Sequence, residues 1–145
     1  MPKPHQLRRA ARKFLDAEDP LAALTDAGVD TTDGGDVREL ILPSDSRVRV
    51  SFQAEGTSHR MMKLFTGELQ VGDSGFDDAV FITTDTKDAT TKLLDADAFR
   101  GAILQVIKRK GHVRINGVDV VIAGGNAQLN ATITAYVLAY AECTT

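Results

Sequence analysis

Apolar residues recur at helical spacing near the start of the chain. In residues 5–17 they fall on one face, while the basic residues fall largely on the other, which predicts an amphipathic helix. A second, shorter helix is expected after Asp19, because Asp19 suits the N-cap, Pro20 suits the first helical position and Gly28 suits the end. The pattern therefore predicts a helical N-terminal segment over residues 1–28.

Alternation of apolar and polar residues predicts the strands that follow. Residues 37–42 and 47–52 flank a turn-rich link and are expected to form a hairpin with one solvent-exposed face. Residues 29–36 are polar and show no periodicity, which predicts a loop. Two further strands are expected at residues 60–65 and 78–84.

Helical spacing returns after these strands. Asp85 is the expected N-cap, a break is expected near Asp95, and the helical pattern continues to the basic run 108–110. Cations suit the C-terminal end of a helix dipole, and Gly111 is the expected stop. A last helix is expected after Asn126.

A hairpin is the clearest local signal in the chain. The dipeptide Asn116-Gly117 is the preferred two-residue type I′ turn. This turn would place Ile115 opposite Val118 on an apolar face. It would also place Arg114 opposite Asp119 on the other face, as a cross-strand pair of opposite charge.

The order of these elements indicates the fold class. Runs of adjacent strands separated by helices predict an α+β fold with an antiparallel sheet of five or six strands. The N-terminal, middle and C-terminal helices are expected to pack mainly on one face of that sheet. No repeat or interdomain linker is visible, so residues 1–145 are expected to form one domain. Whether residues 1–28 pack on its core stays open.

Composition narrows the classes of function. The apolar share of 43% and the charged share of 26% are typical of globular proteins, and the net charge of −3 argues against general nucleic-acid binding. No apolar run approaches the roughly 20 residues of a membrane span, and no apolar signal region follows the basic N-terminus. The single cysteine, Cys143, excludes an intrachain disulfide and suits a reducing compartment. A cytoplasmic location is therefore expected.

The acidic, glycine-rich stretch Phe65–Asp85 looks more like a ligand loop than any other part of the chain. Asp73, Asp77 and Asp78 do not have the spacing of a helix-loop-helix calcium site, and no glutamate closes the loop. The glycines match no phosphate-binding pattern. A strand–loop–strand connection with solvated acidic side chains is therefore expected.

The candidate catalytic residues do not have the spacing of a known catalytic motif. His5, His59 and His112 have no acid–base partner at a meaningful spacing. Ser74 lies in GDSGF, where a nucleophile elbow would need glycine in place of the phenylalanine. Cys143 lies near the chain end and is expected to be a fraying helix residue. The sequence predicts a protein that is not an enzyme and that holds no metal or cofactor.

Three segments of the chain resemble an uncharacterised family of bacterial α+β domains: FTGE, GFDDAVFITTD and DATTKLLD. The matching positions are Thr66, Gly67, Glu68, Phe76, Asp77, Asp85, Leu93 and Leu94. The resemblance runs from Arg60 to the C-terminus and implies a fold more than a function. Members often carry apolar membrane segments, which this chain lacks. The order of elements alone is similar to that of the small acidic chaperones of type III secretion, an analogy of fold.

Two classes of function stay open. The first is an interaction or scaffold module that binds a protein partner or a second copy of itself. The second is a domain that binds a small ligand between sheet and helices. Leu138 lies off the apolar stripe of the last helix, so a partner is expected to cover it, and a homodimer is the economical partner. The basic N-terminal helix lacks the tryptophan and bulk expected of a membrane-binding face. The interaction candidates are Arg8, Arg9, Arg12, Lys13, Tyr136, Leu138 and Tyr140.

Overall fold

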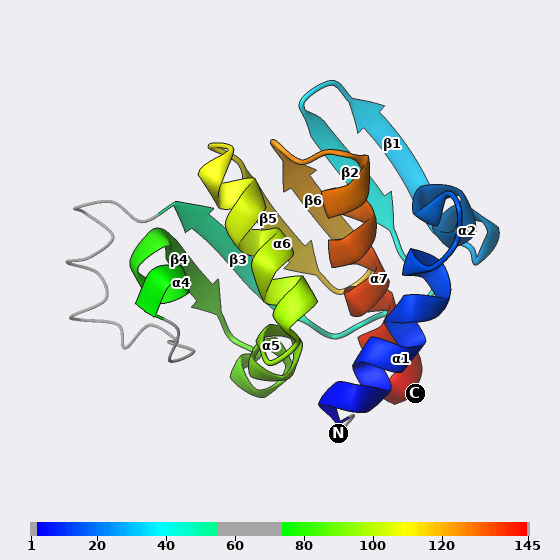
Figure 1. Cartoon of the computed structure of the whole chain (residues 1–145), viewed down its shortest axis with the longest axis horizontal. Helices are drawn as coiled ribbons and strands as arrows, with labels where there is room; N and C mark the ends of the chain where they lie inside the picture. The colour runs from blue at the N-terminus through cyan, green and yellow to red at the C-terminus, as the bar shows by residue number, and fades with distance from the viewer. Residues whose placement is uncertain (1–2, 55–73, 145) are drawn as a thin grey trace.

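A computed structural model of the chain describes residues 3–54 and 74–144 (Figure 1). Its strands form one six-stranded sheet in the order β1-β2-β6-β5-β3-β4, in which neighbouring strands are antiparallel. The strands are β1 (Asp30–Gly34), β2 (Val37–Ile41), β3 (Arg49–Ala54), β4 (Val80–Thr84), β5 (His112–Asn116) and β6 (Asp119–Ala123). The helices are α1 (Pro4–Leu15), α2 (Pro20–Asp26), α4 (Ser74–Ala79), α5 (Lys87–Leu94), α6 (Asp97–Lys108) and α7 (Ala127–Thr144). The predicted α+β fold is confirmed.

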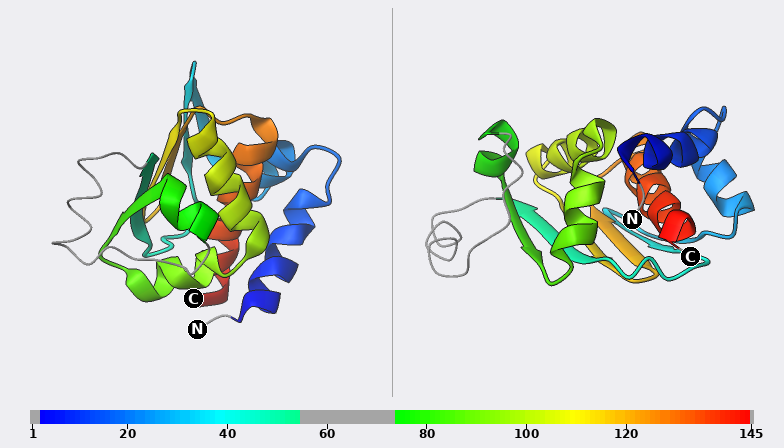
Figure 2. Two further views of the ribbon diagram at one scale, coloured as in Figure 1. Left: turned by 60° about the vertical axis from the view of Figure 1, so that its left-hand side comes forward. Right: turned by 90° about the horizontal axis from the view of Figure 1, so that it is seen from below.

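The helices lie on one side of the sheet (Figure 2, right). Because side chains of a strand alternate between its two faces, every second strand residue points toward the helices. These inward residues form one apolar core with the helices. Its strand members are Leu40, Val50, Phe52, Val80, Ile82, Val113, Ile115, Val120 and Ile122. The expected packing of helices on one face is therefore confirmed.

The N-terminal helices pack on this core. Leu7, Ala11 and Phe14 form the buried stripe of α1, on the face that the helical spacing predicted. In α2, Leu24 is fully buried, and the carboxylate of the N-cap Asp19 accepts a hydrogen bond from the backbone of the first turn. The described part of segment 1–28, whose packing the sequence left open, therefore belongs to the core.

The central helix is α7, which lies between α1 and the sheet (Figure 2). It is buried continuously from Asn130 to Ala141 because α1, α2, α5 and α6 all contact it. Asn126 caps its start, as predicted: the side-chain oxygen accepts a hydrogen bond from the Leu129 N–H at 2.8 Å. None of the helices in the described part of the chain combines the length and hydropathy needed to cross a membrane.

The first strands pair differently from the sequence prediction. Residues 29–36, expected to be a loop, contain β1, which forms a tight hairpin with β2. Gly35 in that turn has a φ of 81°, which glycine adopts without strain. The predicted hairpin of β2 with β3 is wrong, since β2 lies between β1 and β6. A polar edge strand such as β1 shows no apolar periodicity, so pattern alone reads it as a loop.

The β5–β6 hairpin is confirmed, but its turn lies one residue later than predicted. Asn116 pairs with Asp119, so the two-residue turn begins at Gly117. Gly117 has a φ of 65°, as the first position of a type II′ turn requires. Arg114 consequently lies opposite Val121, and the predicted pair of opposite charges is wrong.

The middle helices begin and end close to the predicted positions. The break at Asp95 separates α5 from α6, as expected. Asp85 does not cap α5: the N-cap is Thr86, and the Asp85 carboxylate instead lies 3.0 Å from the Arg49 guanidinium. After α6, Lys110 takes the positive φ of 65° that the following glycine was expected to adopt.

Candidate functional site

The face of the sheet opposite the helices is open, and no described helix packs on it (Figure 2, right). Alternate residues of β2, β6, β5 and β3 point toward this open sheet face. They are Val37, Glu39, Ile41, Asp119, Val121, His112, Arg114, Asn116, Arg49, Ser51 and Gln53, all of them exposed or half-buried. Apolar side chains concentrate on β2 and β6, and basic ones on β5 and β3. The β2–β6 half of this surface is therefore more apolar, and the β5–β3 half is more basic.

One row across the open sheet face carries opposite charges around an apolar centre. Val121 on β6 lies between Glu39 on β2 and Arg114 on β5. Because adjacent strands are about 4.8 Å apart, the backbones at Glu39 and Arg114 are about 10 Å apart. Both residues are exposed, and neither forms an ion pair with another described residue. The row thus presents two unpaired charges of opposite sign.

A hollow of 390 Å³ lies beside this row, where β5, β3 and β4 meet the solvent. Arg114, Arg49, Ser51 and Thr83 are among the residues that line it. The Arg49 guanidinium is engaged by the Asp85 carboxylate at 3.0 Å. The hollow gives the basic half of the open sheet face a concave relief into which side chains of a partner could fit.

The basic residues of α1 lie on its solvent side, as predicted. Arg8, Arg9, Arg12 and Lys13 are all exposed. Arg12 lies 3.6 Å from the Asp16 carboxylate, and Lys13 lies 3.2 Å from the Glu142 carboxylate at the end of α7. Exposed pairs of this kind contribute little to stability, so the cationic surface stays available to a ligand or partner.

The apolar candidates on α7 are placed differently from the prediction. Leu138 is 0% exposed, so the expectation that a partner covers it is wrong. The second side of α7 is covered by α1 and α2 of the same chain. Tyr136 and Tyr140 are only 2% and 5% exposed, so neither ring is offered to a protein partner. The Tyr136 ring instead packs near that of Phe99, with centroids 6.2 Å apart.

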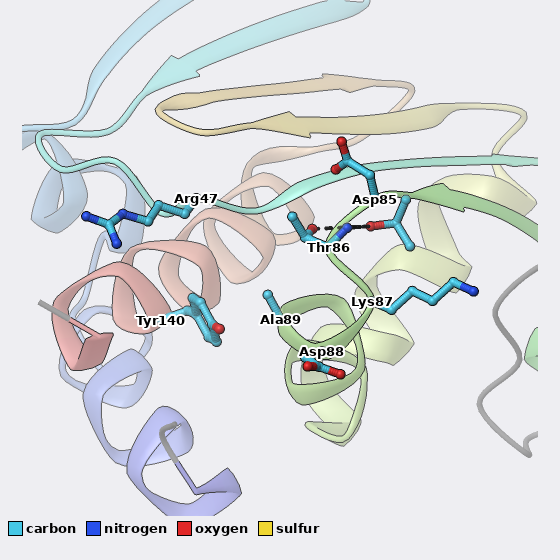
Figure 3. A pocket seen from close by; sticks show the side chains of 8 residues that line it. Arg47, Asp85, Thr86, Lys87, Asp88, Ala89 and Tyr140 are labelled. Atoms are coloured by element: carbon cyan, nitrogen blue, oxygen red, sulfur yellow. Dashed lines mark hydrogen bonds between the residues drawn. The ribbon is translucent and has the colours of Figure 1, made fainter.

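A second hollow, of 470 Å³, lies where β4 runs into α5 (Figure 3). The hydroxyl oxygens of Thr84 and Thr86 lie 3.2 Å apart. Each also donates to the Arg49 carbonyl oxygen, at 2.6 and 3.1 Å respectively. Figure 3 shows Arg47 and Lys87 extending away from each other. These hydrogen bonds join the ends of β3 and β4 to α5, which is a structural role.

Tyr140 closes one side of this second hollow, facing Ala89 (Figure 3). Burial raises the pKa of its phenol above the ordinary value of 10.0, and the Asp88 carboxylate raises that pKa further. The phenol is therefore neutral at neutral pH and is a poor base or nucleophile. A neutral phenol at this position can donate a hydrogen bond.

The acidic stretch is partly helical, which differs from the expected loop. Asp77 and Asp78 lie on α4, and Asp77 is in the first turn, where an acid suits the helix dipole. Asp73 and His59 lie outside the described residues, and His112 lies on the open sheet face. Among the described residues, no three His, Cys, Asp or Glu side chains come together as a metal site would require.

Comparison of the chain with protein-family models, with curated proteins and with solved structures gives no match. The resemblance to a bacterial α+β family therefore stays a prediction, as does the analogy with secretion chaperones. Of the positions that carry the resemblance, Thr66, Gly67 and Glu68 lie outside the described residues. Leu93 and Leu94 are buried core residues of α5, a packing role that many folds share.

Sequence analysis did not single out Glu39, Val121 and Arg114 as a group. Alternation within each strand is enough to place Glu39 and Arg114 on the polar face. It cannot place the two residues in one row, because β2 and β6 are distant in sequence and become neighbours only through the sheet order. The sequence signal for this row was a pair of opposite charges, Glu39 and Arg114, on the polar faces of two predicted strands.

Proposed function

We propose that this protein is a non-enzymatic interaction module that forms a homodimer through its open sheet face. The observation that carries the proposal is the row in which Glu39 and Arg114 flank Val121. A surface with separate positive and negative ends around an apolar centre is complementary to a rotated copy of itself. Two-fold contacts of this self-complementary kind are the commonest solution among oligomers.

The sheet order defines how two copies would meet. Because β6 lies between β2 and β5, a two-fold axis along β6 brings β2 of each copy over β5 of the other. Glu39 of one copy then faces Arg114 of the second copy, and this contact occurs twice. Val121 meets its own counterpart on the axis. Two sheets packed face to face lie about 10 Å apart, with strand directions within about 30° of each other, as in β-sandwiches.

The apolar residues of the same face support this arrangement. Val37 is 41% exposed, and Ile41 and Val121 are half-buried, so the β2–β6 half has apolar surface left to bury. In the proposed dimer β5 of the second copy covers Val37 and Ile41, and β6 of the second copy covers Val121. Burial of apolar area supplies the affinity, and the two charge pairs set the orientation.

Charge reversal tests the arrangement directly. Glu39→Arg and Arg114→Glu each place like charges opposite each other twice, so each variant is expected to shift the protein toward monomer. The double variant Glu39→Arg/Arg114→Glu restores both pairs with the signs exchanged, and it is expected to recover the dimer. Light scattering and sedimentation at several protein concentrations measure these changes.

The matched control is Arg9→Glu, which makes the same charge change on the exposed side of α1. It is expected to leave the dimer intact. A wild-type protein that is monomeric at high micromolar concentration would refute the proposal. So would a dimer that Arg9→Glu disrupts and Arg114→Glu does not, since the basic face of α1 would then be the interface.

A further inference from the structure

We infer that the cavity between α1 and the start of α6 binds a phosphate group through Arg8, Tyr136 and the first-turn N–H groups of α6. The cavity has a volume of 270 Å³ and is lined by His5, Arg8, Asp95, Ala96, Asp97, Ala98 and Tyr136. It lies on the helix side of the molecule, away from the open sheet face. Neither its existence nor its test depends on the proposed dimer.

Tyr136 is the observation that points to a ligand. The residue is 2% exposed, yet it lines the cavity, and its hydroxyl forms no hydrogen bond with any described residue. The hydroxyl oxygen is not one of the fully enclosed polar atoms that lack a partner in the described part of the chain, so it is reached from the cavity. A ligand oxygen in the cavity would supply a hydrogen-bond partner.

Charged groups of both signs act on the Tyr136 hydroxyl. Burial raises the pKa of Tyr136, the guanidinium groups of Arg8 and Arg12 partly lower it, and the Asp97 carboxylate adds to the rise. Arg8 and Asp97 also line the cavity. The Arg8 guanidinium therefore acts electrostatically on the Tyr136 hydroxyl and lines the same cavity.

The start of α6 supplies further donors. The first N–H groups of a helix have no acceptors within it, and the N-cap Ala96 has no side chain able to accept from them. No other side chain caps this end of the twelve-residue helix. Uncapped N–H groups and the positive end of the helix dipole favour an oxyanion, and phosphate is the common ligand of such an end.

Two acidic residues line the same cavity and set the balance of charge. The Asp97 side chain is 90% exposed and bonds the Arg100 guanidinium at 2.8 Å, so its carboxylate points to solvent. Asp95 is exposed and forms no ion pair with another described residue. Arg8 therefore only balances the Asp95 carboxylate, so the N–H groups of α6 supply the net attraction for a phosphate, and removal of the Asp95 charge should strengthen binding.

Titration with inorganic phosphate tests the site, with sodium chloride of equal ionic strength as the reference. We expect calorimetric binding and a rise in melting temperature beyond that of the chloride reference. Arg8→Gln should weaken binding about tenfold to a hundredfold, because it removes a charged donor, and Tyr136→Phe should weaken it about two- to tenfold. Asp95→Asn should strengthen it.

The control variant is Arg9→Gln, which removes an equal charge from the same helix but does not line the cavity. It should bind phosphate as the wild type does. Equal losses in Arg8→Gln and Arg9→Gln would overturn the inference, because they would indicate general attraction to a basic helix. Absence of any phosphate effect beyond the chloride reference would overturn it as well.

Glycerol phosphate, used as a second probe, separates two sources of the same group. Equal affinity for both probes would support a site for free phosphate. Tighter binding of glycerol phosphate would support a site for a small phosphate ester, whose alcohol part uses the rest of the 270 Å³ cavity.

Discussion

Gly111 and Gly124 meet backbone to backbone at the open end of the β5–β6 hairpin. A Cβ on Gly124 would lie 2.8 Å from the Cα of Gly111, and a Cβ on Gly111 would collide with the carbonyl oxygen of Ala123. The Arg109 side chain adds a hydrogen bond from its Nε to the Gly124 carbonyl oxygen at 2.8 Å. The end of α6 is therefore held against the end of β6 by contacts that only glycine permits.

Gly111→Ala is expected to destabilise the protein by about 3 kcal/mol, because the added methyl group forces two backbone segments apart. Gly101→Ala is the matched control. Gly101 lies inside α6 with open space where a Cβ would be, so this change should stabilise by about 0.5–1 kcal/mol. Urea denaturation measures both. Equal stability of Gly111→Ala and wild type would show that the close approach does not exist.

Lys110→Gly is expected to stabilise the protein by about 1 kcal/mol. Lys110 has a φ of 65°, a left-handed conformation that costs a side-chain-bearing residue about 1 kcal/mol and costs glycine nothing. Lys108→Gly removes the same charge from the last turn of α6 and should instead destabilise by about 1 kcal/mol. If both variants lose stability in chemical denaturation, Lys110 is not the left-handed residue.

The position of the β5–β6 turn could not be predicted from local sequence alone. Asn116-Gly117 has the chemistry of a type I′ turn, yet the turn is centred one residue later. The Gly117 carbonyl oxygen accepts a hydrogen bond from the Ser46 hydroxyl at 2.6 Å, and the Gly117 N–H donates to the Val48 carbonyl oxygen at 2.9 Å. These partners are about seventy residues away in sequence. No turn propensity could include them, although the hairpin itself was predictable.

The same distinction between local and distant contacts explains which features of the candidate sites could be predicted from the sequence. Helical spacing was enough to predict the buried face of α1 and the exposed positions of Arg8 and Arg9. It could not predict that α1 would cover α7, so Leu138 was wrongly expected to need a partner. It also could not place Arg8 and Tyr136 at one cavity, because that arrangement requires both α1 and α6 to pack on α7.

Thr134→Val is expected to stabilise the protein by about 1 kcal/mol. Thr134 is 0% exposed and its hydroxyl has no hydrogen-bond partner among the described residues, so replacing the hydroxyl by a methyl group of similar size removes an unmet polar group. Thr90 provides the contrast, since it is equally buried but its hydroxyl lies 3.0 Å from that of Thr84. Thr90→Val should destabilise by about 1 kcal/mol. Opposite signs for the two variants in thermal denaturation are the decisive result.

Alkaline pH is expected to weaken the fold through Tyr136 and Tyr140. Burial raises the pKa of both phenols above the ordinary value of 10.0. A folded-state pKa above the unfolded one means that the folded protein holds these protons more tightly. The associated stability is therefore present below pH 10 and is lost as the pH rises through the folded-state values.

Phenolate absorbance reports this titration cleanly, because the chain has two tyrosines and no tryptophan. The native protein should ionise at a higher pH than the same protein in concentrated urea. The Tyr136→Phe variant isolates Tyr140, and its free energy of unfolding should fall less steeply above pH 10 than that of the wild type. Lysine residues lose their protons in the same range, but they do so in both proteins, so the difference between them belongs to Tyr136. Coincident absorbance titrations of native and urea-denatured protein would show that both hydroxyl groups are solvated and would contradict their burial.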